Sequence, residues 1–208
     1  MPRGLRDTAG SLGSPHAHDA IDAHFAPWHL CPGRLPKLAG LDRRQTPARL
    51  RLQNPALTFV PGFTADPACL PDSPGAYLIL LDLIAPMGLP PRFGDERLAP
   101  GLYVYAGSAR GPGGIRARAG RHLRGDGARR WHIDWLTAAA SSRRALPLTM
   151  RGECAAVQTL ARDNAFAIPV PGFGNSDCPT CDAHLLRWQG KGSGDAATRA
   201  ILAALFQV

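Results

Sequence analysis

Arginine is concentrated in one short stretch of the chain, beside a loop rich in glycine. Residues 110–130 include seven arginines and a single acidic residue, Asp126. If the stretch is helical, Arg118, Arg121 and His122 share one face. A guanidinium group is a planar fork that matches phosphate oxygens, so the pattern suits contacts with phosphate. A basic face that meets only solvent is the equal alternative.

Cysteine and histidine form a second pattern nearer the end of the chain. Cys178 and Cys181 have C-x-x-C spacing, and His184 follows three residues later. This spacing is typical of zinc sites, which use four thiolate or imidazole ligands. Because only three ligands are local, Cys154 or His132 would have to complete the site. Otherwise the cysteines are reduced thiols packed at the edge of the core.

Two acidic residues stand at defined points of the predicted elements. Glu153 opens a segment of high helical propensity, where an acid is favoured by the helix dipole. Asp134 lies in the run Trp-His-Ile-Asp, where a buried aspartate can form hydrogen bonds that fix His132 or a loop.

Composition narrows the classes of protein. The chain has 208 residues, with 24 Lys and Arg against 16 Asp and Glu, a net charge of +8. This balance favours a polyanionic partner, and nucleic acid in particular. With an odd number of cysteines, no apolar segment of signal-peptide length and no run of 18 apolar residues, we expect a soluble cytoplasmic protein without membrane contact.

The elements that must position these residues are those of one small domain. Apolar runs predict buried strands and a wide antiparallel hairpin, over 76–83 and 102–106. Further strands are expected at 146–150 and 184–188, and helices at 115–123, from 131 and at 153–163. The fold class is therefore α/β (α+β), with a small, mainly antiparallel sheet of three to four strands flanked by helices.

The domain occupies the middle of the chain. Residues 1–65 lack sustained periodicity and are rich in Pro, Gly and Arg, so we expect disorder there. The domain is placed at 70–189. Residues 190–208 are expected to form a Gly-rich linker and a short C-terminal helix.

Short motifs on these elements stand in an informative order. Gly75-Ala76-Tyr77 lies on the first strand and Tyr105-Ala106-Gly107 on the second. Arg118 follows Gly107 by eleven residues, on the first helix, and His122 comes one turn later. This order resembles the GIY-YIG nuclease superfamily, with Gly-x-Tyr and Tyr-x-Gly on two strands and then an arginine. The middle isoleucine of each motif is alanine here, at positions expected to face the core.

A second set of motifs resembles an uncharacterised GIY-YIG-like branch, one sometimes fused to endonuclease III. The resemblance extends from about residue 74 to about residue 188. It is carried, in order, by Tyr105–Ala109, Gly113–Gly114, Arg121–Arg124, Trp131–Asp134, Gly152–Cys154, Gly172–Gly174, Ser176–Cys178 and His184–Leu185. The asparagine that many members of the superfamily have late in the domain is not matched securely, since Asn175 stands in a different context.

The resemblance implies a role for each matching residue. Tyr77 would lie near the attacking water, with Tyr105 as its partner in the site. Arg118 would stabilise charge on the scissile phosphate, and His122 would add a polar group on the same helix face. Glu153 would hold one divalent ion, Mg²⁺ or Mn²⁺, with Asp134 as the competing carboxylate. Otherwise Glu153 is only an acid favoured by the helix dipole.

The nucleic acid would meet the glycine of the second motif and the arginines around the first helix. Glycine there allows close backbone approach. The set expected to contact nucleic acid is Gly107, Arg110, Arg116, Arg121 and Arg124. We therefore expect a metal-dependent endonuclease acting on DNA, in repair or DNA processing. The alternative is a non-catalytic nucleic-acid-binding module of the same fold, and the motifs do not distinguish DNA from RNA.

Overall fold

The structure, a computed structural model, describes residues 62–206. The prediction of disorder for residues 1–65 falls mostly outside the described residues, and only residues 62–65 are described. Among these, Thr64 forms an antiparallel bridge with Ala145, in which each backbone N–H donates to the other residue's carbonyl, at 2.8 and 2.7 Å.

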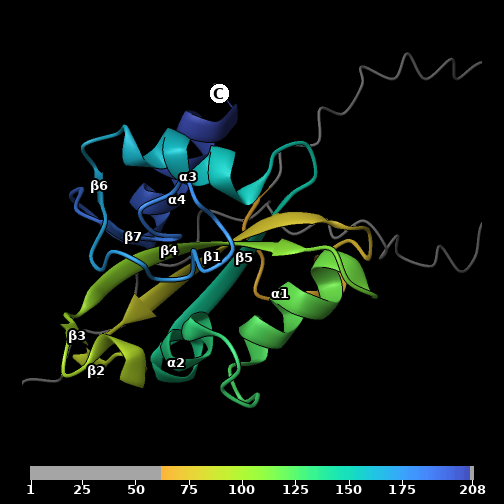
Figure 1. The fold of residues 1–208 in the computed structure, drawn as a ribbon. Helices are drawn as coiled ribbons and strands as arrows, with labels where there is room; N and C mark the ends of the chain where they lie inside the picture. Colours follow the sequence, from red (N-terminus) through yellow and green to blue (C-terminus); the bar gives the residue numbers. More distant parts are fainter. Residues whose placement is uncertain (1–61, 207–208) are drawn as a thin grey trace, which may run out of the picture. The chain divides into compact units, whose positions relative to one another are not determined.

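A five-stranded antiparallel sheet is the centre of the fold, with strand order β5-β1-β4-β7-β6 (Figure 1). Its strands are β1 (Gly75–Leu83), β4 (Gly101–Ala109), β5 (Ser142–Leu148), β6 (Phe166–Ala167) and β7 (Leu185–Trp188). The loop between β1 and β4 holds a small second sheet of β2 (Met87–Gly88) and β3 (Arg97–Leu98). The predicted α+β class, with helices flanking a mainly antiparallel sheet, is confirmed.

The number of strands and the place of β5 differ from the prediction. The main sheet has five strands, one more than the sequence predicts. The strand that the sequence does not indicate is β6, because its two residues are too few to give a periodic pattern. β5 begins at Ser142, four residues before the predicted start, and the sequence does not predict its first residues because they are polar. Arg143 is nevertheless fixed, since its guanidinium donates to the carbonyls of Leu123 and Ala140, both at 3.1 Å. Pro147 is tolerated because β5 is an edge strand.

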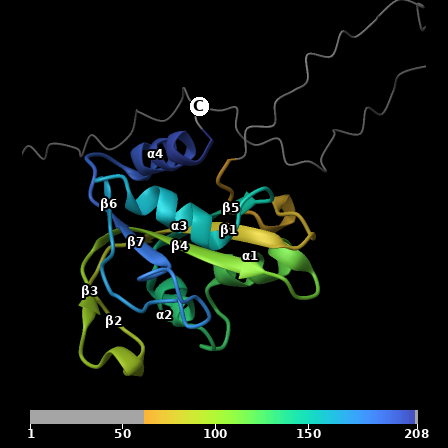
Figure 2. The same cartoon turned by 45° about the horizontal axis from the view of Figure 1, so that its top comes forward.

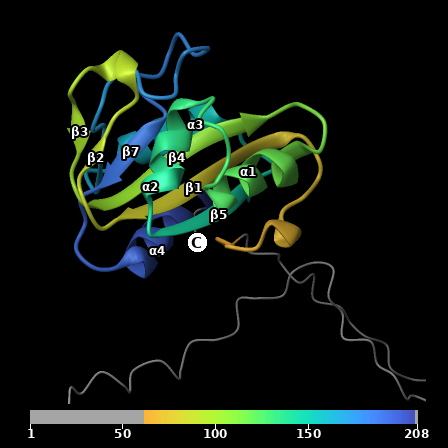
Figure 3. The ribbon, with the colours of Figure 1, turned by 90° about the horizontal axis from the view of Figure 1, so that it is seen from below.

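Both faces of the sheet are covered by helices. The helices are α1 (Gly114–Arg124), α2 (His132–Ala139), α3 (Glu153–Ala161) and α4 (Gly194–Phe206), with short 3₁₀ turns at Pro67–Cys69 and Pro91–Phe93. Seen from below, α1 and α2 lie in front of the strands (Figure 3), while α3 and α4 lie together on the other face (Figure 2). Successive strand residues point to opposite faces of the sheet. Because helices cover both faces, β1 has buried apolar residues at every position from 76 to 81.

Two hydrophobic cores result, one on each side of the sheet. Tyr77 and Ile79 of β1 pack with α1 and α2, whereas Leu78 and Leu80 pack with α3 and α4. α4 buries Ala197, Ile201 and Leu205 in the second of these cores. The predicted C-terminal helix is therefore present and packs on the sheet, so the packed domain extends past residue 189, to 206. Within the described residues, no helix has the length and apolar character needed to cross a membrane.

We expect Ile201→Ala to lower the free energy of unfolding by about 2–5 kcal/mol, because Ile201 lies on the buried face of α4 and is fully enclosed. The matched control is Ile84→Ala, since the Ile84 side chain is 74% exposed and its loss changes stability by less than about 0.5 kcal/mol. Urea unfolding of the two variants measures the difference. Equal stabilities would mean that α4 is not part of the domain core.

Candidate functional site

The first site lies at the end of the sheet where β1 begins and β4 ends. The antiparallel register places Tyr77 directly opposite Gly107. A Cβ atom at Gly107 would lie 2.6 Å from both Cζ and Oη of Tyr77, and 3.0 Å from Cε1 of Tyr105. Glycine is thus required because two phenol rings cross its backbone. The sequence predicts that nucleic acid approaches the backbone at Gly107. In the structure, the side chains of Tyr77 and Tyr105 occupy the space beside this glycine.

Tyr105 is enclosed from its other side by a second glycine. Gly174 has a φ of +77°, and a Cβ atom there would lie 2.6 Å from Cε2 of Tyr105. The Gly174 N–H donates to Nδ1 of His132 at 3.1 Å, which fixes this backbone beside the ring. Tyr77 is 1% exposed and Tyr105 is 9% exposed, so the two rings form a nearly closed slot between glycines.

Both phenols stay protonated at neutral pH. Burial raises the pKa of Tyr77 well above its usual value, and Tyr105 adds to the rise, against the lowering effect of Arg118. Burial also raises the pKa of Tyr105 to about 12, again against Arg118, while Asp134 and Glu153 add to the rise. The hydroxyls therefore act as hydrogen-bonding groups and not as phenolates, and Arg118 and Glu153 lie near them.

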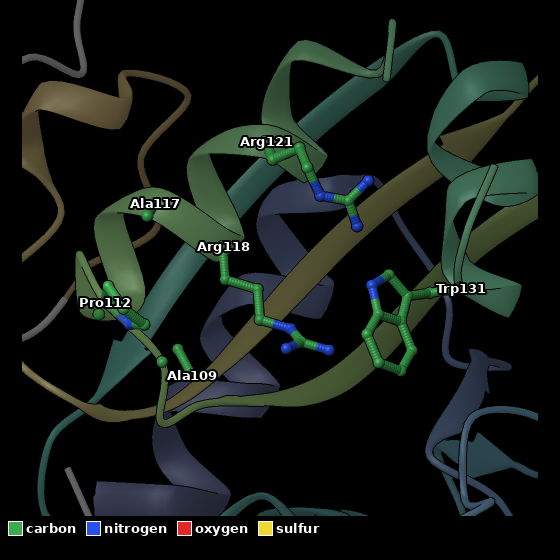
Figure 4. Close-up of a pocket in the computed structure, with 8 residues that line it drawn as sticks. Ala109, Pro112, Ala117, Arg118, Arg121 and Trp131 are labelled. Atoms are coloured by element: carbon green, nitrogen blue, oxygen red, sulfur yellow. The ribbon is translucent and has the colours of Figure 1, made fainter. Parts of the chain in front are cut away.

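A pocket of about 210 Å³ opens beside this slot (Figure 4). Arg118 and Arg121, one turn apart on α1, both extend toward Trp131 in the loop before α2. The guanidinium carbon of Arg118 lies 4.3 Å from the centre of the Trp131 ring, which is 45% exposed. Small residues of the glycine-rich loop complete the lining. The pocket thus presents two guanidinium groups, and no acidic residue is among the residues that line it.

Asp134 organises the side of the pocket that faces α2. Its Oδ1 lies 2.9 Å from Nη2 of Arg121 and 3.2 Å from Nδ1 of His122. Its Oδ2 accepts the backbone N–H groups of Arg130 and Trp131, at 2.8 and 2.9 Å. Although burial opposes it, these contacts hold the pKa of Asp134 well below its usual range.

The contacts of Asp134 agree with one of the two roles expected for it. Both Asp134 oxygens are occupied by protein donors, so this carboxylate fits the expected alternative of a buried, hydrogen-bonded aspartate. Of the two partners expected for it, His132 or a loop, Asp134 bonds the loop at 130–131, and it also contacts Arg121 and His122.

His122 lies behind the slot. It is 1% exposed, and the centre of its ring is 5.9 Å from that of Tyr77. Burial lowers the pKa of His122, although Asp134 opposes the effect. A neutral, enclosed imidazole packed against Tyr77 can hold that ring in place, but it does not line the pocket.

The predicted basic face is divided between two sides of α1. Arg116 donates from Nε to the Leu70 carbonyl at 2.7 Å, and its Nη1 lies 3.6 Å from Asp72. Arg124 follows Gly120 by one turn, on the side that packs against the turn at 67–69. These two arginines secure or flank the segment before β1. Of the helix arginines, only Arg118 and Arg121 line the pocket.

Glu153 reaches the same end of the sheet from α3. It is the first residue of that helix, and its Oε1 lies 3.9 Å from Nη2 of Arg110, the residue after β4. The Glu153 side chain is 16% exposed and that of Arg110 is 84% exposed. Because Glu153 raises the pKa of Tyr105, its charge acts on the tyrosine slot. Among the described residues this long ion pair is the one it makes, which leaves carboxylate oxygens open to a ligand.

A second cluster gathers three thiols and one imidazole at the start of α3. The ligand atoms of Cys154, Cys178, Cys181 and His184 all lie within 4.8 Å of one another. The Cys154 sulfur is 3.5 Å from that of Cys178 and 3.7 Å from Nε2 of His184. Tetrahedral zinc with Zn–S bonds of about 2.3 Å separates its sulfurs by about 3.7 Å. The cluster can therefore hold a metal ion.

The fourth member of this cluster is Cys154, and not His132. Both ring nitrogens of His132 are engaged elsewhere, Nδ1 with the Gly174 N–H and Nε2 with Nη1 of Arg92, at 3.3 Å. Of the two fourth ligands considered, the structure therefore supplies the thiol on α3.

Trp131 is the pocket residue that sequence reasoning missed as a site residue. The sequence indicates it as the start of a helix and as part of a motif shared with the family it resembles, without a role in the site. Its position directly after two arginines, at the end of a glycine-containing loop, is the signal that suggests an exposed aromatic ring near a basic site.

Residues 76–206 match the family described as "Domain of unknown function DUF123", and the chain belongs to this family. The match covers more than half of the chain and runs from β1 to α4, so it includes both clusters. No curated protein and no solved structure matches the chain.

We expect Gly107→Ala to lower the free energy of unfolding by about 1–3 kcal/mol, because the new methyl group would overlap the enclosed Tyr77 ring. Gly111→Ala is the control, since no atom lies within 4 Å of a Cβ there. Urea unfolding reports both. If Gly107→Ala is as stable as the control, the slot is looser than described.

Asp134→Asn should lower stability by about 3–5 kcal/mol at pH 7, because it leaves Arg121 without its buried counter-charge. The pKa of Asp134 is lowered by folding, so its contribution is complete above the unfolded pKa of about 3.9 and declines as the pH falls below it. Urea unfolding of wild type and variant at pH 7 and pH 3 should therefore show a narrower gap at pH 3. A constant gap would contradict a charge-based role.

Proposed function

We propose that the chain is a metal-dependent endonuclease of the GIY-YIG type, which hydrolyses phosphodiester bonds in DNA. The observation that most supports this is the convergence of Tyr77, Tyr105, Arg118 and Glu153 at one end of the sheet. Four residues from four different elements meet there, in the motif order of that superfamily.

The pocket suits a phosphate. Arg118 is stacked on Trp131, and Arg121 is held by Asp134, so two guanidinium groups are fixed before a ligand arrives. Preorganised cations stabilise the charge that develops on a transferred phosphoryl group without first having to reorient. We assign Arg118 to the scissile phosphate, because it also acts on both tyrosine hydroxyls.

The tyrosines suit the orientation of an attacking water. Their raised pKa values keep the hydroxyls protonated, so each can both donate and accept a hydrogen bond. A water bound between such hydroxyls and the phosphate would be positioned for in-line attack. His122, packed behind Tyr77, would act through the position of that ring.

Glu153 suits a divalent ion. Its carboxylate has one distant protein partner, and Mg²⁺ or Mn²⁺ is often held by one or two carboxylates with water as the other ligands. Such an ion would supply a lowered pKa for bound water and polarise a phosphoryl oxygen. Glu153 is thus the residue we assign to this ion.

The other cluster suits a different metal. Thiolate ligands favour zinc over Mg²⁺ or Mn²⁺, and we propose zinc at Cys154, Cys178, Cys181 and His184. The thiols of Cys154, Cys178 and Cys181 are free, so all three are available as ligands. The exposed Arg110 and the arginines of the pocket support DNA as the partner.

Cleavage assays of the purified full chain test the proposal. Supercoiled, branched and damaged DNA should be nicked with Mg²⁺ or Mn²⁺ and remain intact with EDTA. Glu153→Gln should reduce the rate at least about 100-fold, the scale of losing one transition-state contact. Glu96→Gln, an exposed acid beside the small β2–β3 sheet, should cleave like wild type.

Two outcomes would overturn the assignment. Undiminished cleavage by a folded Glu153→Gln variant would remove Glu153 from the site. Salt-sensitive DNA binding by wild type, without nicking at any metal concentration, would favour the non-catalytic binding module. The same assay with RNA of matched sequence decides between the two nucleic acids.

A further inference from the structure

The Cys154–Cys178–Cys181–His184 cluster joins the start of α3, which carries Cys154, to the loop at 178–184, whose last residue bonds the strand that carries Tyr105. We propose that zinc bound there acts as a brace that fixes the first turn of α3, and with it Glu153, against the strand that carries Tyr105. That this position matters for cleavage rests on the proposed function. The brace itself is a property of the fold and can be measured without DNA.

The cluster joins two segments that are far apart in the sequence. Cys154 belongs to α3, whereas the other three members lie in the loop that leads into β7. Three side-chain hydrogen-bonding contacts connect these segments among the described residues, and each ends on the cluster. They are Cys154 with Cys178 at 3.5 Å, Cys154 with His184 at 3.7 Å, and Gln158 with Cys181 at 4.0 Å.

The first turn of α3 lacks a side-chain cap. Its N-cap is Gly152, so no side chain caps the free N–H groups of the helix start. The chain before it is exposed, with Met150 at 92%. Glu153 and Cys154 are the first two residues of this turn. A bond from the Cys154 sulfur to an ion would therefore restrain the neighbouring Glu153 directly.

The opposite end of the cluster is anchored beside the slot. The His184 carbonyl accepts the N–H of Ala106, next to Tyr105, at 2.9 Å, and the His184 N–H donates to the Phe173 carbonyl at 2.8 Å. Phe173 precedes Gly174, whose backbone lies against the Tyr105 ring. An ion bound to Nε2 of His184 would thus connect Glu153 to the frame of the tyrosine slot.

The ligand set favours a structural role for this ion. Four protein ligands close a tetrahedral zinc site, whereas catalytic zinc keeps one position for water or substrate. Cys181 and His184 are buried, and Cys154 and Cys178 are half-buried, which limits access for a substrate. The zinc would thus hold Glu153 in position relative to the tyrosine slot, and would not itself contact the substrate.

Metal content is the first part of the test. The full chain, purified without a polyhistidine tag or chelator, should contain one zinc per chain by mass spectrometry. Cys178→Ser should lose the zinc, and Ser176→Ala, an exposed neighbour in the same loop, should keep it. Zinc-free wild type that also fails to take up added zinc would overturn the proposal.

Hydrogen exchange is the second part. Removal of zinc, by Cys178→Ser or by chelation of wild type, should speed exchange of amides in the first turn of α3 and in residues 172–184 at least about tenfold, through local opening. Exchange in α1 should not change. Unchanged exchange in α3 would overturn the brace, and so would an equal loss of protection throughout the domain. Restored protection on adding zinc back to the chelated wild type is the control.

The dependence of cleavage on Mn²⁺ distinguishes positioning from metal binding at Glu153. Cys178→Ser retains the carboxylate, so it should need at least about tenfold more Mn²⁺ and recover at high concentration. Glu153→Gln should not recover. A wild-type Mn²⁺ requirement in Cys178→Ser would overturn the positioning role. If no variant or wild type cleaves DNA, zinc content and exchange still decide whether the brace exists.

Discussion

The pairing of β1 with β4 is the constraint on which the site depends. Its register puts Tyr77 opposite Gly107, and the phenol ring lies across the one residue type that leaves room for it. A shift of one residue would turn Tyr77 to the other face of the sheet, among the residues packed under α3 and α4. Because residues 76–81 of β1 are buried on both faces, the register is fixed by two cores at once. The slot for the tyrosines is therefore as rigid as the centre of the domain.

Around that slot, similar side chains are held by different forces. Arg118 is stacked on an aromatic ring, Arg121 is paired with a buried carboxylate, and Arg116 is bonded to the chain before β1. The helix that carries them thus presents two guanidinium groups to the pocket and uses another for structure. Asp134 is central to this division, because it also bonds the backbone of the loop that presents Trp131.

Helix α3 carries a carboxylate and a thiol in consecutive residues. The charge of Glu153 acts on Tyr105, while Cys154 belongs to the cysteine and histidine cluster. Hard oxygen donors and soft sulfur donors select different ions. Under the proposed function, one turn of helix would therefore serve two metals, and the position of one ligand would affect the other because the two residues share a backbone.

The sequence by itself determined the α+β class, the two central strands and most helices, because long apolar runs and helical propensity are local signals. It also indicated Tyr77, Tyr105, Arg118 and Glu153 through their order, and three of the four members of the Cys/His cluster through their spacing. The two-residue strand β6, the early start of β5 and the packing of α4 were decided by tertiary contacts that no local pattern records. The same holds for the fourth cluster member, for the division of the arginines and for the exposure of Trp131. Each depends on which elements pack side by side, and such proximity arises only when distant parts of the chain bury their apolar surfaces together.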